Sequence, residues 1–495
     1  MWLLITCTLV TTLYATSLTI ANVSLPQIQG ALSASPDQIS WVVTANLIAT
    51  AVTIPLAGWI ASRFGRRRAM MWGIAGFIAA TVMCGFATSL AELVLWRVLQ
   101  SAFGSPLTPI SQSIVIDEFT GTKRGPALSI YSMGVSIPPT LAPLIGGYVS
   151  ELISWRWVFF ILVPIALVAF LGTLTSIRPD PPRHKRPKLD WIGFLSLSTA
   201  VACIQLMLDR GERAEWFGST EIIVECALAV LFGWIFLMHS LTKDRPFIDA
   251  RLLLERNFAL GIGISAIFGM LFVTPMVLIP AMLQQLRNLP EITVGTLIAA
   301  RGAGTILAML IMIFFAHSWN PRLLFLIGFG LHTYAGLEMA RFEMNVSLSE
   351  VAWVMGLQGF GVGWLWVPMT LVTFSNLDPR RSAEGATLFH FVRSIASSYY
   401  ISASVIVVFH TQKISYSELV QWINPFNNRL RLQSVMGDWS TESTAGLARI
   451  SGEVARQATN IGYVNAFNLF LWTSLLVYPL IALIVWPPTG YRPRT

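Results

Sequence analysis

Long apolar runs follow one another through almost the whole chain of 495 residues. A helix that crosses a lipid bilayer needs about 20 apolar residues, and these runs have about that length. They lie at residues 2–24, 40–61, 69–88, 91–116, 126–150, 155–177, 190–208, 220–241, 257–283, 291–315, 322–340, 351–374, 383–410 and 463–486. Because every backbone polar group inside a bilayer must find a partner, such runs predict helices. The sequence therefore predicts an all-α polytopic membrane protein with fourteen transmembrane helices.

Charged residues make up only 12% of the chain, whereas a soluble domain carries about 25%. A soluble protein of this length could not cover its surface with so few charges, so a large soluble catalytic domain is excluded. The four cysteines lie in separate apolar runs without paired spacing, which favours neither a disulfide framework nor a metal site. No metal, cofactor or catalytic residue is expected from these patterns.

Lys and Arg are distributed unequally between alternate loops. The net charge of +8 would favour a nucleic-acid partner in a soluble protein, but in a membrane protein positive loops indicate the cytoplasmic side. With the amino terminus in the cytoplasm, 20 of the 33 Lys and Arg fall in inner loops and 5 in short outer loops. This distribution predicts a multi-pass protein with both termini in the cytoplasm, and no nucleic-acid partner.

Two stretches interrupt the series of apolar runs. Residues 178–190 are basic and rich in proline, which suits a solvated cytoplasmic linker. Residues 411–462 are polar with helix-like amphipathic pieces, around 446–460 for example, and predict an outer loop. For this loop we favour a solvated cap over an element that docks a partner.

Several short motifs occur between and inside the runs in a fixed order. The turn after the second run, residues 58–68, reads GWIASRFGRRR, in which small residues permit close helix packing and arginines can bind helix carboxyl ends. Other segments are TIANVSLP at 19–26, LWRVLQ at 95–100, LIGG at 144–147, WRWVFF at 155–160, LDWIGF at 189–194, LMLDRGE at 206–212, RGAG at 301–304, QGFGVG at 358–363 and EGATLF at 384–389. In this order and at this spacing, they resemble the major facilitator superfamily, in its fourteen-helix drug:proton antiporter branch of the EmrB/QacA type.

The resemblance implies a fold and a division of the chain. Two six-helix bundles are expected at residues 1–177 and 257–495, with a linker and two inserted central helices at 178–256 and a periplasmic loop at 411–462. It also implies the export of a small molecule across a bacterial inner membrane by alternating access and in exchange for protons. A periplasmic adaptor and an outer-membrane channel are further partners that some relatives use.

The same resemblance implies which helices line the central cavity, namely the first, fourth, ninth and twelfth. The candidate substrate-binding residues on them are Asn22, Arg97, Gln100, Gln112, Phe268, Phe272, Met276, Gln358, Trp364 and Trp366. The candidate residues for conformational gating are Gly58, Arg63, Gly65, Arg66, Arg67, Gly146 and Gly147. For the run of glycines at 359–363, close helix packing explains the spacing better than a dinucleotide site, because no strand precedes it.

The chain departs from this family at several positions. An acidic residue usual in the first helix is replaced by Ser17, and an acid often present in the cytoplasmic turn is replaced by Ser62. The glycine-proline pair common in the fifth helix becomes Ala142-Pro143, and an asparagine expected in the sixth helix is replaced near Leu162. These departures leave the fold prediction unchanged, but they leave open which residue carries the proton.

Charges inside the predicted helices are basic rather than acidic. Every carboxylate lies in a loop or within about two turns of a helix end, whereas Arg97, Arg301 and Arg393 lie deeper, and His390 precedes Arg393 by three positions. An unpaired charge at such depth costs about 3 kcal/mol or more, so the arginines must face protein or water. We predict proton coupling through Arg97, His390 and Arg393, and expect His332 to be a hydrogen-bonded core group.

The sequence thus favours efflux of amphipathic or weakly acidic compounds. A lipophilic cation would ordinarily need a buried carboxylate, because an unpaired cation is costly in a low-dielectric site. The alternative is a sensor or scaffold of transporter fold that does not transport, which the missing acid in the first helix favours. An enzyme is disfavoured, because neither a metal-ligand pair nor a nucleophile elbow is present.

Overall fold

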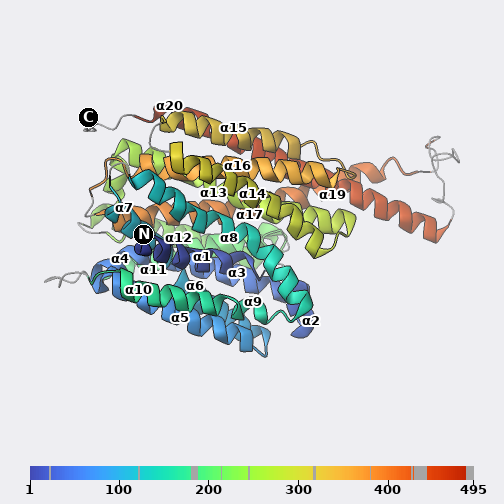
Figure 1. The fold of residues 1–495 in the computed structure, drawn as a ribbon. Coiled ribbons are helices and arrows are strands. Elements are labelled where there is room, and N and C mark those ends of the chain that lie inside the picture. The colour runs from blue at the N-terminus through green and yellow to red at the C-terminus, as the bar shows by residue number, and fades with distance from the viewer. Residues whose placement is uncertain are drawn as a thin grey trace.

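The computed structural model describes residues 1–21, 24–120, 123–179, 188–212, 214–243, 246–315, 319–378, 381–424, 427 and 443–485, and these form helices and connecting turns (Figure 1). The helices are α1 (Trp2–Thr19), α2 (Leu25–Ala31), α3 (Pro36–Thr53), α4 (Leu56–Phe64), α5 (Arg66–Phe86), α6 (Leu90–Gly104), α7 (Leu107–Glu118), α8 (Arg124–Leu152), α9 (Trp157–Phe160), α10 (Leu162–Ser176), α11 (Trp191–Arg210), η2 (Trp216–Gly218), α12 (Thr220–Thr242), η3 (Ala250–Leu254), α13 (Arg256–Arg287), α14 (Glu291–Phe315), α15 (Pro321–Met339), α16 (Leu348–Thr373), α17 (Ser382–Val420), α19 (Thr444–Leu475) and α20 (Val477–Leu483).

The fourteen predicted helices are confirmed, each as one helix or as two consecutive helices. Four of them are interrupted: α3 with α4, α6 with α7, α9 with α10, and α19 with α20. The first two breaks coincide with Pro55 and Pro106, where the missing N–H and the ring disrupt the helix. Within the described residues, ten helices are long and apolar enough to span a bilayer, or eleven when α3 and α4, bent by 53°, count as one.

Two predicted boundaries differ from the structure. The first apolar run was expected to form a helix to residue 24, but α1 ends at Thr19 and a short helix, α2, starts before Pro26. The outer loop predicted at 411–462 is shorter, because α17 continues to Val420 and α19 begins at Thr444. Figure 1 shows the ends of α17 and α19 projecting beyond the other helices. The predicted loop boundary is wrong because a polar stretch of sequence continues as helix here.

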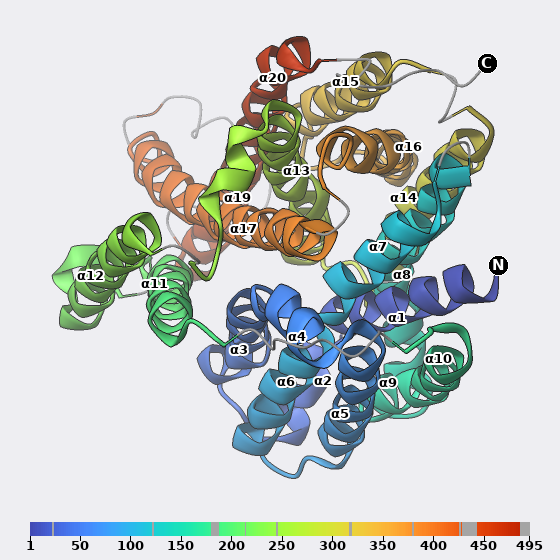
Figure 2. The same cartoon turned by 90° about the vertical axis from the view of Figure 1, so that its left-hand side faces the viewer.

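The helices form two groups and a separate pair. Helices α1 to α10 pack around one another, as do α13 to α20, and we refer to these as the N-terminal and C-terminal groups. The two groups meet along α8 with α14, and along α4 and α7 with α17. Figure 2 shows α11 and α12 to one side of both groups. The division of the chain at residues 178 and 257 stays a prediction about which parts move together.

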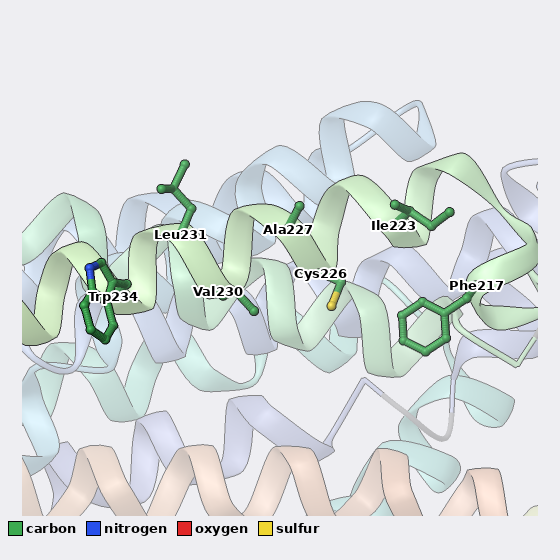
Figure 3. A pocket seen from close by; sticks show the side chains of 7 residues that line it. All are labelled: Phe217, Ile223, Cys226, Ala227, Val230, Leu231 and Trp234. Carbon is green, nitrogen blue, oxygen red and sulfur yellow. The ribbon is translucent and has the colours of Figure 1, made fainter.

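The pair of α11 and α12 is attached to the two groups mainly through α11. Ser398 and Ser402 of α17 donate hydrogen bonds to Gln205 (2.7 Å) and Asp209 (2.6 Å) of α11, while α11 also packs against α3. Phe217 of η2 and apolar side chains of α12 from Ile223 to Trp234 border an open groove (Figure 3). Little of this apolar face is packed against the rest of the protein, so it suits contact with lipid chains.

Asp190 lies at the end of this pair where α11 begins and α12 ends. Its carboxylate accepts hydrogen bonds from Lys243 Nζ (2.8 Å), from the His239 ring (2.9 Å), and from the backbone N–H groups of Gly193 and Phe247. Burial alone would raise the pKa of Asp190, but the bonds from Lys243 and His239 outweigh it and hold the pKa below its ordinary value of 3.8.

Asp190→Ala should therefore destabilise the α11–α12 pair by about 1.5–3 kcal/mol, the range for hydrogen bonds to a charged group. Because the folded-state pKa is lowered, the contribution of Asp190 is present above the unfolded-state pKa and is lost only as the pH falls through the folded-state value. Thermal unfolding in nanodiscs should show that Asp190→Ala is less stable than the unmodified protein by the same amount at about pH 7 and at about pH 5. Glu221→Gln, at the exposed pair with Arg210, is the control and should have almost no effect.

Candidate functional site

A chain of polar side chains crosses from one group to the other. His390 of α17 binds the side-chain oxygen of Gln112 on α7 through Nε2, and Arg393 Nη2 donates to His390 Nδ1 at 2.9 Å. Gln112 Nε2 in turn donates to the hydroxyl of Thr370 on α16 (3.3 Å). The Arg393 guanidinium lies 4.6 Å from the ring centroid of Trp366. Gln112 thus joins the N-terminal group to two helices of the C-terminal group.

These contacts define the tautomer of His390. A guanidinium has only donors, so Nδ1 of His390 must be an acceptor and carry no proton. The proton of the neutral ring is then on Nε2, where it is donated to Gln112. A second proton on Nδ1 would face the N–H groups of Arg393 and break that hydrogen bond. Protonation of His390 would therefore release the Arg393 guanidinium from the imidazole.

Arg301 of α14 lies in a second buried cluster, and each of its three guanidinium nitrogens has a hydrogen-bond partner. It donates to Gln358 Oε1 (2.5 Å), to the carbonyl of Phe272 (2.7 Å), and to Thr140 Oγ1 of α8 (3.3 Å). Gln358 is also 3.4 Å from His332, whose other ring nitrogen bonds the Gly328 carbonyl, as expected for a core histidine. Arg301 therefore holds the two groups together and has little capacity left for a ligand.

Glycines at the contact between α14 and α16 let these helices approach closely enough to form the cluster around Arg301. A Cβ at Gly359 would lie 2.0 Å from the Arg301 carbonyl oxygen, and one at Gly304 would lie 2.0 Å from that of Gly356. Only glycine fits at such distances. Close helix packing, as predicted, accounts for the glycine run at 359–363.

Arg97 of α6 is fully buried inside the N-terminal group. Its Nη1 donates to the backbone carbonyl of Ser17 on α1 (3.0 Å) and to Gln100 Oε1 (2.7 Å), and the guanidinium lies 5.9 Å from the Phe159 ring. Gln100 is held by a hydrogen bond to Thr81 (2.8 Å). Nε and Nη2 of Arg97 have no hydrogen-bond partner, although a buried donor without one costs about 1–3 kcal/mol.

The predicted aromatic residues are only partly brought together. Phe268, Phe272 and Trp366 form one buried cluster with ring centroids 5.3 to 6.3 Å apart. Trp364 packs in a separate apolar cluster with residues of α14 and α15, so the structure does not bring it together with the other three, and its role in substrate binding stays a prediction. The reason is that residues two apart on a helix face different sides.

Met276 is half-buried on α13, and Asn22 lies outside the described residues.

The cytoplasmic turn predicted for gating is built around Gly65. This residue joins α4 to α5 at φ 87°, a left-handed conformation that favours glycine. Arg66 forms an ion pair with Asp117 of α7 (2.6 Å), and Asp117 accepts a hydrogen bond from Ser382 at the start of α17 (3.0 Å). A Cβ at Gly58 would lie 3.2 Å from Thr387 Oγ1, also on α17. The two groups are thus in contact at the end of the molecule that holds this turn.

Other predicted gating residues stay within the N-terminal group. Arg67 donates to the carbonyl of Leu174 at the end of α10 (2.7 Å), and Arg63 lies over the rings of Trp59 and Phe64. A Cβ at Gly146 would lie 2.6 Å from the Ile20 carbonyl oxygen, so this glycine lets α8 approach α1, and Gly147 beside it is also buried.

On the opposite side from the cytoplasmic turn, the groups meet through two glycines of α14. A Cβ at Gly295 would lie 3.4 Å from the Cα of Leu144 on α8, and a Cβ at Gly302 would lie 3.3 Å from the side chain of Leu141, two helical turns deeper along α14. The groups therefore touch at the end that holds the Gly65 turn, at mid-depth and at the opposite end.

Sequence reasoning did not single out Asp117, Thr140, Thr370, Ser382 or Thr387 as site residues, yet these bridge the two groups. Each is a small or loop-proximal polar residue of a kind found throughout membrane helices. Their positions opposite Arg66, Arg301, Gln112 and Gly58 follow from packing between distant helices. One signal for Asp117 was available in the sequence. This acid lies next to a predicted helix end, and an acid there can form an ion pair with the basic turn that holds Arg66.

Comparisons with known proteins agree with this architecture. Residues 7–400 match the profile of the Major Facilitator Superfamily. The chain is 34% identical over 478 residues to the multidrug export protein EmrB of Escherichia coli (strain K12), covering 95% of this chain and 92% of that protein. It is 29% identical over 471 residues to the fatty acid resistance protein FarB of Neisseria gonorrhoeae, covering 94% and 92%.

A solved structure has the same fold at low sequence identity. The human organic anion transporter MFSD10 (TETRAN) aligns with a TM-score of 0.57 and 12% identity, over 95% of this chain and 98% of that one. Fold, motif order and relatives therefore agree, and the chain belongs to the major facilitator superfamily, in its group of EmrB-type transporters.

Proposed function

We propose that the protein exports small amphipathic compounds, neutral or weakly acidic, across a bacterial inner membrane in exchange for protons. Its relatives named as multidrug export proteins support efflux. The observation that carries the coupling is the chain from Gln112 through His390 to Arg393, which links the two groups at mid-depth. Alternating access would open and close the contacts on either side of it.

Proton coupling in this proposal runs through His390. A proton that arrives from outside adds to Nδ1 and breaks the bond from Arg393, while Nε2–H stays bonded to Gln112 of the facing group. Loss of the proton to the cytoplasm restores the bond between Arg393 and His390. This arrangement needs no acid at Ser17, because the titrating group is the imidazole.

The predicted orientation belongs to the same proposal. Both termini would be cytoplasmic, and the ends of α17 and α19 periplasmic. A periplasmic adaptor and an outer-membrane channel stay predictions from the resemblance.

A cysteine at the exposed Trp422 should react with a membrane-impermeant thiol reagent in cells whose outer membrane is permeabilised, while one in a tag after Thr495 should not. The native cysteines are buried or half-buried, so background labelling should be low. Labelling of the tag alone would show that the protein has the opposite orientation in the membrane.

Charge preference is the test of the substrate class. Cells that express the protein should gain resistance to a weak-acid uncoupler and gain less against a permanent quaternary ammonium cation, because the buried charges named above are arginines. Growth inhibition by each compound, with Arg97→Ala cells as the inactive control, measures the difference. Protection against the cation alone would contradict the proposal.

A further inference from the structure

The interface between the two groups has two edges, and they are built differently. At one edge α8 and α14 touch directly, where glycines of α14 let the helices approach. At the other edge α3 and α17 share few contacts, and α11 packs against both of them. Figure 2 shows α11 beside α3 and α17, on the side away from α8 and α14. Helix α11 therefore covers one edge of an interface that alternating access would open.

A row of hydrogen bonds joins α11 to α17. Gln205 and Asp209 of α11 accept bonds from two serines of α17, as described above. The hydroxyl of Tyr399 on α17 donates to the backbone carbonyl of Val201 on α11 (3.2 Å). The three acceptor positions on α11 are each four residues apart, so they follow one face of the helix.

Glu212 extends this row beyond the end of α11. Its carboxylate accepts hydrogen bonds from Lys413 Nζ on α17 (2.6 Å) and from the indole N–H of Trp216 (3.0 Å). Because Trp216 lies in η2, between α11 and α12, this carboxylate also ties the turn of the pair to α17. Polar contacts thus hold the pair to the C-terminal group at successive positions from Val201 to Glu212.

The contact of α11 with α3 is of another kind. The guanidinium of Arg210 on α11 lies 5.7 Å from the centroid of the Trp41 ring on α3. The hydrogen bonds that described side chains of α11 make lead to α17, to α12 or back to α11 itself. Side-chain packing and this cation–π contact therefore hold α11 against α3.

These two kinds of contact differ in what their separation costs in a bilayer. Apolar side chains that leave α3 meet lipid tails of similar polarity, so little free energy is lost. Polar groups of α11 that leave α17 would have no new partner, because lipid tails offer none. When the two groups move apart, the contact of α11 with α3 is therefore the one that separates.

We propose that α11 and α12 move with the C-terminal group and form a cover over the edge between α3 and α17, which opens and closes at the contact with α3. The inference rests on the proposed alternating-access export and specifies its moving parts. The inserted pair is then a part of the C-terminal moving unit rather than a passive linker.

Two neighbouring positions of α11 supply a matched test, since Asp209 contacts α17 and Arg210 contacts α3. In full-length protein in proteoliposomes, Trp41→Cys with Arg210→Cys is bridged by a bis-methanethiosulfonate reagent, and Asp209→Cys with Ser402→Cys is bridged in the same way. The first bridge should lower the export of decanoate, a weakly acidic amphipathic probe, by about tenfold or more, and a reducing agent should restore it. The second bridge should leave export within about twofold of the unbridged protein.

Each single-cysteine variant, treated with the same reagent, controls for modification of one side chain alone. The native cysteines are buried or half-buried, which limits their reaction. Loss of export with the bridge to α17, and not with the bridge to α3, would place the pair in the N-terminal moving unit and overturn the inference. An equal effect of both bridges would also overturn it.

Distances between spin labels give a readout that does not depend on export. One label replaces the exposed Val224 of α12, and the second replaces either Ala31 of α2 or Glu418 of α17, which are also exposed. On acidification and addition of decanoate in nanodiscs, the distance to residue 31 should change and the distance to residue 418 should not.

The two readouts together separate this inference from the proposed function. If the distances respond as expected but decanoate is not exported, the inference stands and export is wrong. If decanoate is exported but the distance to Glu418 changes while that to Ala31 stays constant, the moving cover is wrong and export stands.

Discussion

Arg97→Ala should lower export by about 100-fold while the protein still inserts in the membrane. The guanidinium makes charge-assisted hydrogen bonds to Ser17 and Gln100, and Arg97 is one of the residues predicted to bind the substrate. Loss of one such bond to a ligand is worth about 3 kcal/mol, which corresponds to the stated factor. Initial rates of decanoate export from everted vesicles, normalised to the amount of inserted protein, measure the effect.

Arg97→Lys is the matched control for charge. A lysine retains the positive charge but offers no planar fork, so we expect partial activity between that of the alanine variant and that of the unmodified protein. Full activity of Arg97→Ala would show that the residue only fills space between α1, α6 and α9.

The second large effect is expected at His390, where substitution should separate transport from proton movement. His390→Gln keeps a polar side chain near Gln112 but cannot take up a proton at neutral pH. Proton flux that depends on substrate should fall to the level of liposomes without protein, while decanoate still binds. A pH-sensitive dye inside proteoliposomes records the flux.

His332→Gln is the control, because His332 is also fully buried in the C-terminal group but bonds the Gly328 carbonyl and Gln358 rather than the facing group. It should retain flux. Normal coupling in His390→Gln would move the proton-carrying role to another group.

Most of the fold could be predicted from the sequence, since each crossing is encoded by local composition and the breaks after α3 and α6 by Pro55 and Pro106. The helix ends were less predictable where polar helices leave the bilayer, as α17 does up to Val420. In such polar segments, hydropathy does not distinguish a helix from a loop.

The candidate site was predictable in kind but not in its pairing. Depth along a helix already indicates that Arg97, Arg301 and Arg393 need partners. It does not indicate that every guanidinium nitrogen of Arg301 has a partner whereas two of Arg97 have none, because the partners come from helices far apart in the chain. Trp364 illustrates the same limit, since the face of a buried helix with apolar residues on every side depends on its neighbours.

Simultaneous measurement of substrate and proton movement in proteoliposomes tests the central claim most directly. With an imposed proton gradient that is acidic on the periplasmic face, the account predicts that decanoate moves toward that face and protons move the opposite way, each dependent on the other. A sensor or scaffold of the same fold would move neither. Proton flux without decanoate movement, or the absence of both with correctly inserted protein, would contradict coupled export.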